Sequence, residues 1–123
     1  MAGASYLGRA PIEAYGNGGF RFAGMSHRGC LLLLPSGIYG WDIDTVERLT
    51  AADFAAVVAE SEAIDVLFLG TGREVVQPPE PVRDTVSGAG IGLEIMDTGA
   101  ACRTYNVLLA EGRRIAAALL AVD

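Results

Sequence analysis

Short runs of uninterrupted apolar residues constrain the fold of this chain more than any other feature of its sequence. These are CLLLL (30–34), the apolar part of DVLFLG (65–70) and IAAALLAV (115–122), and each has the length of a strand. A strand without alternating polar residues is typical of a sheet that is covered on both faces. In the second half of the chain, helical patterns separate the strands, which favours a mostly parallel sheet with helices packed on it.

Caps and periodicity predict the elements between these strands. Thr50, with Asp53 three residues later, matches the pattern of a capping box that begins a helix. Thr98 begins a longer helix that Gly112 ends. The stretch IEAYGNGGFRFAG (12–24) predicts two short strands around a glycine-rich turn. We therefore expect a small α/β layered domain with an N-terminal β-hairpin added at a sheet edge.

Length and composition limit the class of protein. A chain of 123 residues is long enough for one domain with a single core, which we expect over residues 11–123 after a flexible segment at 1–10. Its longest apolar runs are far shorter than the ~20 residues that a membrane helix needs. We therefore expect a soluble, cytoplasmic protein without membrane insertion. The lack of lysine beside many alanines, glycines and arginines points to a bacterial source.

Charge and ligand counts exclude two kinds of function. The net charge of −6 removes most of the electrostatic attraction to a phosphate backbone, so no nucleic-acid partner is expected. One histidine and two cysteines that are far apart in sequence do not form a zinc site, and two cysteines do not make a disulfide framework. We expect no bound metal and no cofactor.

The Gly-Thr-Gly sequence at 70–72 is the first candidate site, because many phosphate-binding loops begin this way. A dinucleotide loop needs a third glycine, but position 75 is Val, and EVVQPPEP delays the next helix. A P-loop needs a lysine, which the chain lacks. The favoured interpretation is a turn that ends a strand. Loops at the carboxyl ends of parallel strands line ligand crevices, however, so Thr71 and Arg73 remain candidates for the edge of a pocket.

The second candidate is Cys102, near the start of the last helix. The unpaired N–H groups of a first helical turn increase the acidity of a thiol, and the adjacent Arg103 acts in the same direction. The same cysteine also falls at the rim of the apolar arc of that helix, where a small buried residue fits well. Core packing is therefore the favoured interpretation. The alternative is a pocket between the turn and this helix, with Asn106 and Arg103 as further lining residues.

Trp41 is the candidate for contact with another protein. It follows Gly40 in IYGWDI, and tryptophan is over-represented among the residues that dominate binding energy at interfaces. A half-buried tryptophan at the edge of a sheet explains the same pattern.

Several stretches in the same order resemble the small Mth-type domain of unknown function. They are YGNGGFRFAG, LLLLPSGIYGWDI, LFLGTGREVVQPP and GIGLEIMDTGAACRTYNVLLAEGRRIAAALL. That family includes the mitochondrial complex I assembly factor 3 proteins and the adipogenesis-associated Mth domain-containing protein. The resemblance implies a three-layer α/β fold around a mixed sheet, in which the final strand can run antiparallel to the others. It implies no established enzyme activity.

Two functional hypotheses follow. The first is a non-catalytic protein-interaction or assembly module, with subunits of respiratory complex I as partners implied by the resemblance. The second is a small-molecule-binding protein or thiol enzyme, whose pocket lies between the Gly70–Gly72 turn and the start of the last helix.

Overall fold

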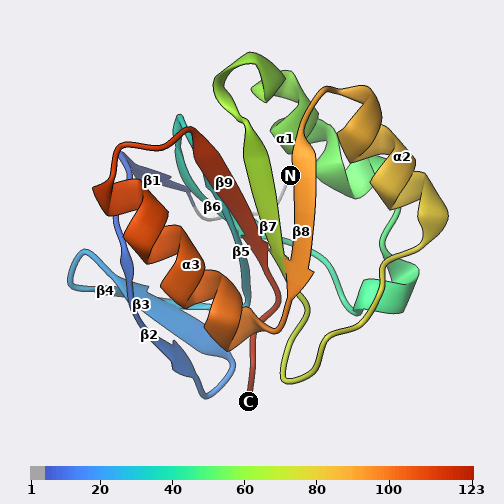
Figure 1. Cartoon of the computed structure of the whole chain (residues 1–123). Helices are drawn as coiled ribbons and strands as arrows, with labels where there is room; N and C mark the ends of the chain where they lie inside the picture. Colours follow the sequence, from blue (N-terminus) through green and yellow to red (C-terminus); the bar gives the residue numbers. More distant parts are fainter. Residues whose placement is uncertain (1–4) are drawn as a thin grey trace.

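The main sheet of this computed structural model, which describes residues 5–123, has six strands in the order β1-β6-β5-β9-β7-β8 (Figure 1). The strands are β1 (Ser5–Leu7), β5 (Cys30–Leu34), β6 (Gly37–Trp41), β7 (Val66–Gly70), β8 (Gly92–Met96) and β9 (Ile115–Leu119). All three uninterrupted apolar runs are strands of this sheet, and two of them, β9 and β7, are neighbours at its centre.

The sheet is mixed, as expected. Strand β7 pairs in parallel with both β8 and β9, whereas β5 pairs antiparallel with β6 and β9, and β1 antiparallel with β6. Strands β6, β7, β8 and β9 therefore share one direction, and β1 and β5 run the other way. Parallel pairing is confined to β9, β7 and β8. The final strand β9 pairs antiparallel with β5 and in parallel with β7, so it is not antiparallel to the whole sheet.

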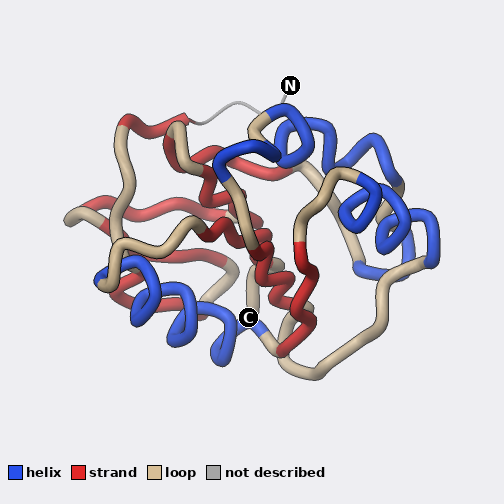
Figure 2. The backbone as a smooth tube through the Cα atoms, turned by 45° about the horizontal axis from the view of Figure 1, so that its top comes forward, coloured by secondary structure: helices blue, strands red, loops and turns tan. Residues whose placement is uncertain are grey.

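Helices and a second sheet cover the two faces of the main sheet, which confirms the three layers (Figure 2). On one face lie α1 (Ala55–Ala59), α2 (Glu80–Gly88) and the short 3₁₀ helices η1 (Val46–Arg48), η2 (Ala51–Phe54) and η3 (Ser61–Ala63). On the other face lie α3 (Thr98–Ala110) and a three-stranded sheet. The helix expected at Thr50 does begin there with a capping box, but its first turn is the 3₁₀ helix η2.

Two apolar cores fill the spaces between these layers. The α2-side core includes Leu32, Leu34, Phe54, Leu67, Leu69, Val82 and Val86. The α3-side core includes Phe20, Phe22, Leu31, Leu33, Phe68, Ala101 and Tyr105. Successive residues of β5 and β7 thus point into different cores, because side chains alternate along a strand. This is why these strands lack polar residues.

The expected N-terminal hairpin is present, but it does not extend the main sheet. Its strands β2 (Ile12–Gly16) and β3 (Gly19–Phe22) join β4 (Met25–Arg28) in a separate antiparallel sheet. Asn17 and Gly18 both have positive φ, which matches the tight turn that two-residue hairpins favour. The inner side of this small sheet contributes Phe20 and Phe22 to the α3-side core.

The segment 1–10 differs from the expectation of a flexible end. Residues 5–7 form β1, which pairs antiparallel with β6 at one edge of the main sheet. Residues 1–4 of the same expectation lie outside the described residues.

Candidate functional site

The turn after β7 is joined directly to the first residue of α3. The N–H of Gly72 donates to Thr98 Oγ1 at 2.9 Å, and the N–H of Thr98 donates to the carbonyl of Gly72 at 2.8 Å. Thr98 Oγ1 in turn donates to the carbonyl of Leu120 at 2.8 Å. One fully buried hydroxyl therefore connects the turn, the helix and the end of the chain.

Gly70 is needed in this turn for space. A Cβ at Gly70 would lie 3.0 Å from the Cα of Thr98 and 3.0 Å from Cδ2 of Leu119. Phosphate-binding loops place exposed backbone N–H groups around an open space, whereas here the backbone of the turn packs against α3 and β9. The geometry supports the interpretation of a strand-ending turn.

The pocket residues expected on the turn face different partners. Thr71 is buried, and its hydroxyl donates to the carbonyl of Glu74 while accepting from the N–H of Val76 at 3.1 Å. The hydroxyl thereby fixes the loop that follows β7. Arg73 is exposed and donates to the carbonyl of Asp123 at the end of the chain.

The pocket residues expected on the helix also serve the fold. The side-chain amide of Asn106 accepts from the N–H of Ile12 and donates to the carbonyl of Ile12, both at 2.8 Å. This pair of bonds ties β2 to α3. Arg103 is exposed, and its Nη1 lies close to Gly99 beside the ring of Tyr15. The four expected pocket residues thus do not face one another across a shared cavity.

Cys102 lies in the α3-side core, with only 3% of its surface exposed. Burial raises the pKa of its thiol to about 12, and the neighbouring Arg103 opposes this rise by a smaller amount. The thiolate is the nucleophilic form, so the protein holds this cysteine in its unreactive form at neutral pH. The single histidine, His27, lies on β4, and its ring nitrogens contact the Tyr6 hydroxyl and the Cys30 carbonyl.

Trp41, the candidate for contact with another protein, is a core residue of β6. It is 7% exposed, its ring packs edge-on against Phe54 at 5.4 Å between ring centroids, and its Nε1 donates to the carbonyl of Asp53 at 3.0 Å. Because its N–H is already bonded and its ring already covered, Trp41 attaches β6 to the helices of the α2 side.

A hollow of about 440 Å³ lies on the three-stranded sheet, in a region that sequence reasoning did not single out. Gly16 and Gly19 are cross-strand partners in it, and Arg21 and Arg28 stand beside them on β3 and β4. Gly16 adds no side chain to the hollow, and no atom lies within 4 Å of the place where its Cβ would be. The arginines that follow the glycine-rich turn in the sequence were the signal that could have indicated this hollow. Strand β4, which forms part of it, has too little apolar alternation to be predicted.

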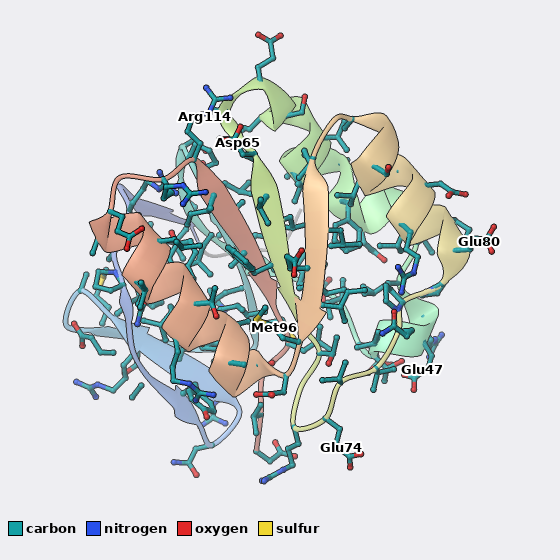
Figure 3. The ribbon with its side chains drawn as sticks, in the orientation of Figure 1. Glu47, Asp65, Glu74, Glu80, Met96 and Arg114 are labelled. Atoms are coloured by element: carbon teal, nitrogen blue, oxygen red, sulfur yellow. The ribbon has the colours of Figure 1, made fainter. Side chains whose placement is uncertain are left out.

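Charged groups elsewhere pair weakly at the surface. Arg114 and Asp65 form an ion pair of 3.4 Å at one end of β7 and β9, where Figure 3 shows their side chains together. Both side chains are largely exposed, so this pair contributes little to stability.

Within residues 5–123, no group of three or more His, Cys, Asp or Glu side chains is placed to hold a metal ion. In the same part of the chain, no helix combines the length and the apolar character needed to cross a membrane.

The chain is similar to solved structures in both sequence and fold. A solved structure described as an outer membrane protein from Bartonella henselae is 52% identical, with a TM-score of 0.92 over 96% of this chain and 99% of that one. A Mth938-like domain from Bordetella pertussis is 31% identical, with a TM-score of 0.74 over 91% of this chain and 85% of that one.

A third relative has a name that states a role. NADH dehydrogenase [ubiquinone] 1 alpha subcomplex assembly factor 3 of Mus musculus is 30% identical over 109 residues, which make up 89% of this chain and 59% of that protein. The chain thus spans about three-fifths of the length of this assembly factor. The family model described as protein of unknown function (DUF498/DUF598) matches residues 12–120. The chain therefore belongs to the DUF498/DUF598 family of Mth938-like α/β domains.

Proposed function

We propose that this chain is a non-catalytic assembly module that acts by contact with other proteins, and that its partners are subunits of the bacterial NADH dehydrogenase, complex I. The observation that carries the proposal is the alignment with the mouse assembly factor over nearly the whole chain. The name of the mouse protein states that it assembles NADH dehydrogenase. We propose the same role for this chain.

The geometry supports a binding role over a catalytic one. The side chains that looked chemically useful in sequence, Thr71, Asn106 and Cys102, are engaged by the fold. The alternative, a small-molecule or thiol enzyme, needs a pocket between the Gly70–Gly72 turn and α3. Direct hydrogen bonds between Gly72 and Thr98 occupy that position.

The proposal places the protein in the cytoplasm and assigns it no nucleic-acid partner. Both described cysteines are free thiols, as is usual in a reducing compartment. The net charge of −6 disfavours phosphate backbones.

The test combines deletion and capture in the source bacterium. Deletion of the gene should lower the amount of assembled complex I on native gels and the rate of NADH:ubiquinone oxidoreduction in membranes. A tagged copy should restore both and should capture named complex I subunits. Normal assembly and normal activity in the deletion strain would refute the proposed role. A tagged Cys102→Ala variant should restore assembly as well as the wild type does, because the proposal gives the thiol no chemical part.

A further inference from the structure

Strand β8 forms one edge of the main sheet, and its outer side carries no strand among residues 5–123 (Figure 1). Its only strand neighbour in this part of the chain is β7, with which it pairs in parallel over all five residues. The strand is partly exposed along its length. An edge of this kind offers main-chain groups to another chain.

The hydrogen bonds at the two ends of β8 show which main-chain groups remain free. The N–H of Gly92 donates to the carbonyl of Asp65, and the carbonyl of Met96 accepts from the N–H of Thr71, both at 2.9 Å. In a parallel pair, every second residue directs both its N–H and its C=O to the same neighbour. Gly92, Glu94 and Met96 therefore face β7. The N–H and C=O groups of Leu93 and Ile95 face outward.

Side chains on β8 differ between the two faces of the sheet. Leu93 and Ile95 pack against the rim of the α2-side core and are half-buried. Glu94 points to the α3 side, in register with Phe68, and is exposed. An added strand would therefore meet an apolar row on one face and a single negative charge on the other.

Pairing with a second copy of this chain is disfavoured by that charge. Two β8 strands can pair antiparallel so that the N–H and C=O groups of Leu93 and Ile95 in both copies are all bonded. In that pairing, Glu94 of one copy lies directly opposite Glu94 of the other. Like charges directly opposite each other destabilise a strand pair. A partner strand with a basic residue at this position replaces the repulsion by attraction.

The surroundings of β8 favour a basic partner as well. Figure 3 shows Glu47 and Glu80 on the α2 side of the molecule and Glu74 below the end of β8. All three are exposed, and the whole chain carries a net charge of −6. Negative potential of this kind speeds the approach of a basic segment.

We propose that the free edge of β8 takes up an extended segment of a protein partner as a seventh strand, with an Arg or Lys opposite Glu94 and apolar residues on either side of it. The basic residue pairs with Glu94 on the α3 face, and the apolar residues extend the α2-side core beside Leu93 and Ile95. Main-chain bonds to Leu93 and Ile95 supply affinity, and the pattern apolar–basic–apolar supplies specificity, as in other cases of strand addition. The inference rests on the proposed function, since it names the kind of partner that an assembly module of this fold holds.

The test is a titration followed by ¹⁵N–¹H NMR with two peptides, Ac-STVRVTS-NH₂ and Ac-STVEVTS-NH₂. With the wild type, the Arg peptide should give saturating shifts at the amides of Leu93 and Ile95. It should bind about 2- to 30-fold more tightly than the Glu peptide, which is the range expected when a cross-strand attraction becomes a repulsion. With Glu94→Lys the preference should reverse.

Glu111→Lys is the matched control, because it makes the same charge change at the exposed end of α3. It should leave the preference for the Arg peptide intact. Equal binding of both peptides, shifts confined to other elements, or no binding at millimolar peptide would overturn the inference. Dimerisation of Glu94→Gln without peptide binding would also overturn it, since the edge would then suit a second copy. Undiminished capture of complex I subunits by tagged Glu94→Lys would refute the edge as the docking site and leave the assembly role standing.

Discussion

The turn at residues 70–72 and strand β8 both adjoin β7, and they differ in what they leave unpaired. In the turn, the main chain of Gly72 and the hydroxyl of Thr98 satisfy one another within the fold. On β8, the main-chain groups of Leu93 and Ile95 face outward. The turn carries the residue types that attract attention in a sequence, and β8 carries ordinary strand residues. A polar group can bind a ligand or a partner only if it is not already hydrogen-bonded within the fold, whatever its residue type.

The largest effect that follows from this comparison concerns Cys102, a buried residue of α3, the helix that the turn contacts through Thr98. Burial raises the pKa of its thiol from 9.0 to about 12. Since each pKa unit is tenfold in the thiolate fraction, Cys102 at pH 7 should hold about 1,000-fold less thiolate than an unperturbed thiol, and its alkylation by iodoacetamide should be much slower. Mass spectrometry of the alkylated residue measures this rate. Urea should abolish the protection, and fast alkylation of the native protein would show that the region is open.

The raised pKa of Cys102 also predicts how the free energy of unfolding changes with pH. A thiol whose pKa is raised by folding contributes stability that is fully present below pH 9, the unfolded value. The contribution is lost as pH rises from 9 through 12. The free energy of unfolding should therefore fall less steeply over this range in Cys102→Ala than in the wild type, and equal slopes would contradict the raised pKa.

A smaller effect is expected from removal of the hydroxyl that joins the turn to α3. Thr98→Val leaves the N–H of Gly72 and the carbonyl of Leu120 without their partner, and each unsatisfied buried group costs about 1–3 kcal/mol. For the two groups together we expect a loss of about 2–6 kcal/mol in urea unfolding. Thr104→Val on the same helix is the control, because no hydrogen bond involves its side chain within residues 5–123. A change within about 0.5 kcal/mol is expected there, and equal effects of the two variants would remove Thr98 from this role.

The smallest expected effect is the stability cost of adding a methyl group in the turn at Gly70. Gly70→Ala places a methyl group against Thr98 and Leu119 and should cost about 1–3 kcal/mol by overpacking. Gly88→Ala at the end of α2 meets no atom within 4 Å, so it should be neutral or gain up to about 1 kcal/mol. Thermal unfolding of both variants gives the difference. If Gly70→Ala were as stable as Gly88→Ala, the turn would have room for a ligand after all.

The sequence predicted the elements whose signals are local. The apolar runs became β5, β7 and β9, and Thr98 begins α3 where the cap pattern placed it, with Asp97 accepting from the N–H of Ala100 as its N-cap. Strands β1, β4 and β6 were not predicted. Strand β1 has only three residues, β4 is mostly polar and β6 contains two glycines. Their strand character therefore depends on pairing with other segments.

The candidate site depended on contacts that no local pattern reveals. Trp41 was a candidate for contact with another protein, but the carbonyl of Asp53 and the ring of Phe54 contact it from another element. Asn106 looked free on a helix, yet it holds Ile12 from 94 residues earlier in the chain. The free edge of β8 is likewise a property of strand order, which depends on the whole chain.

Native-state hydrogen exchange of individual amides tests the contrast between turn and edge most directly. The amides of Gly72 and Thr98 should exchange only in slow, large-scale opening, because both donate within the buried junction. The amides of Leu93 and Ile95 should exchange orders of magnitude faster, while that of Glu94 between them stays protected by β7. Rapid exchange at Gly72 and Thr98, or strong protection at Leu93 and Ile95 in the isolated protein, would contradict a closed turn beside an open edge.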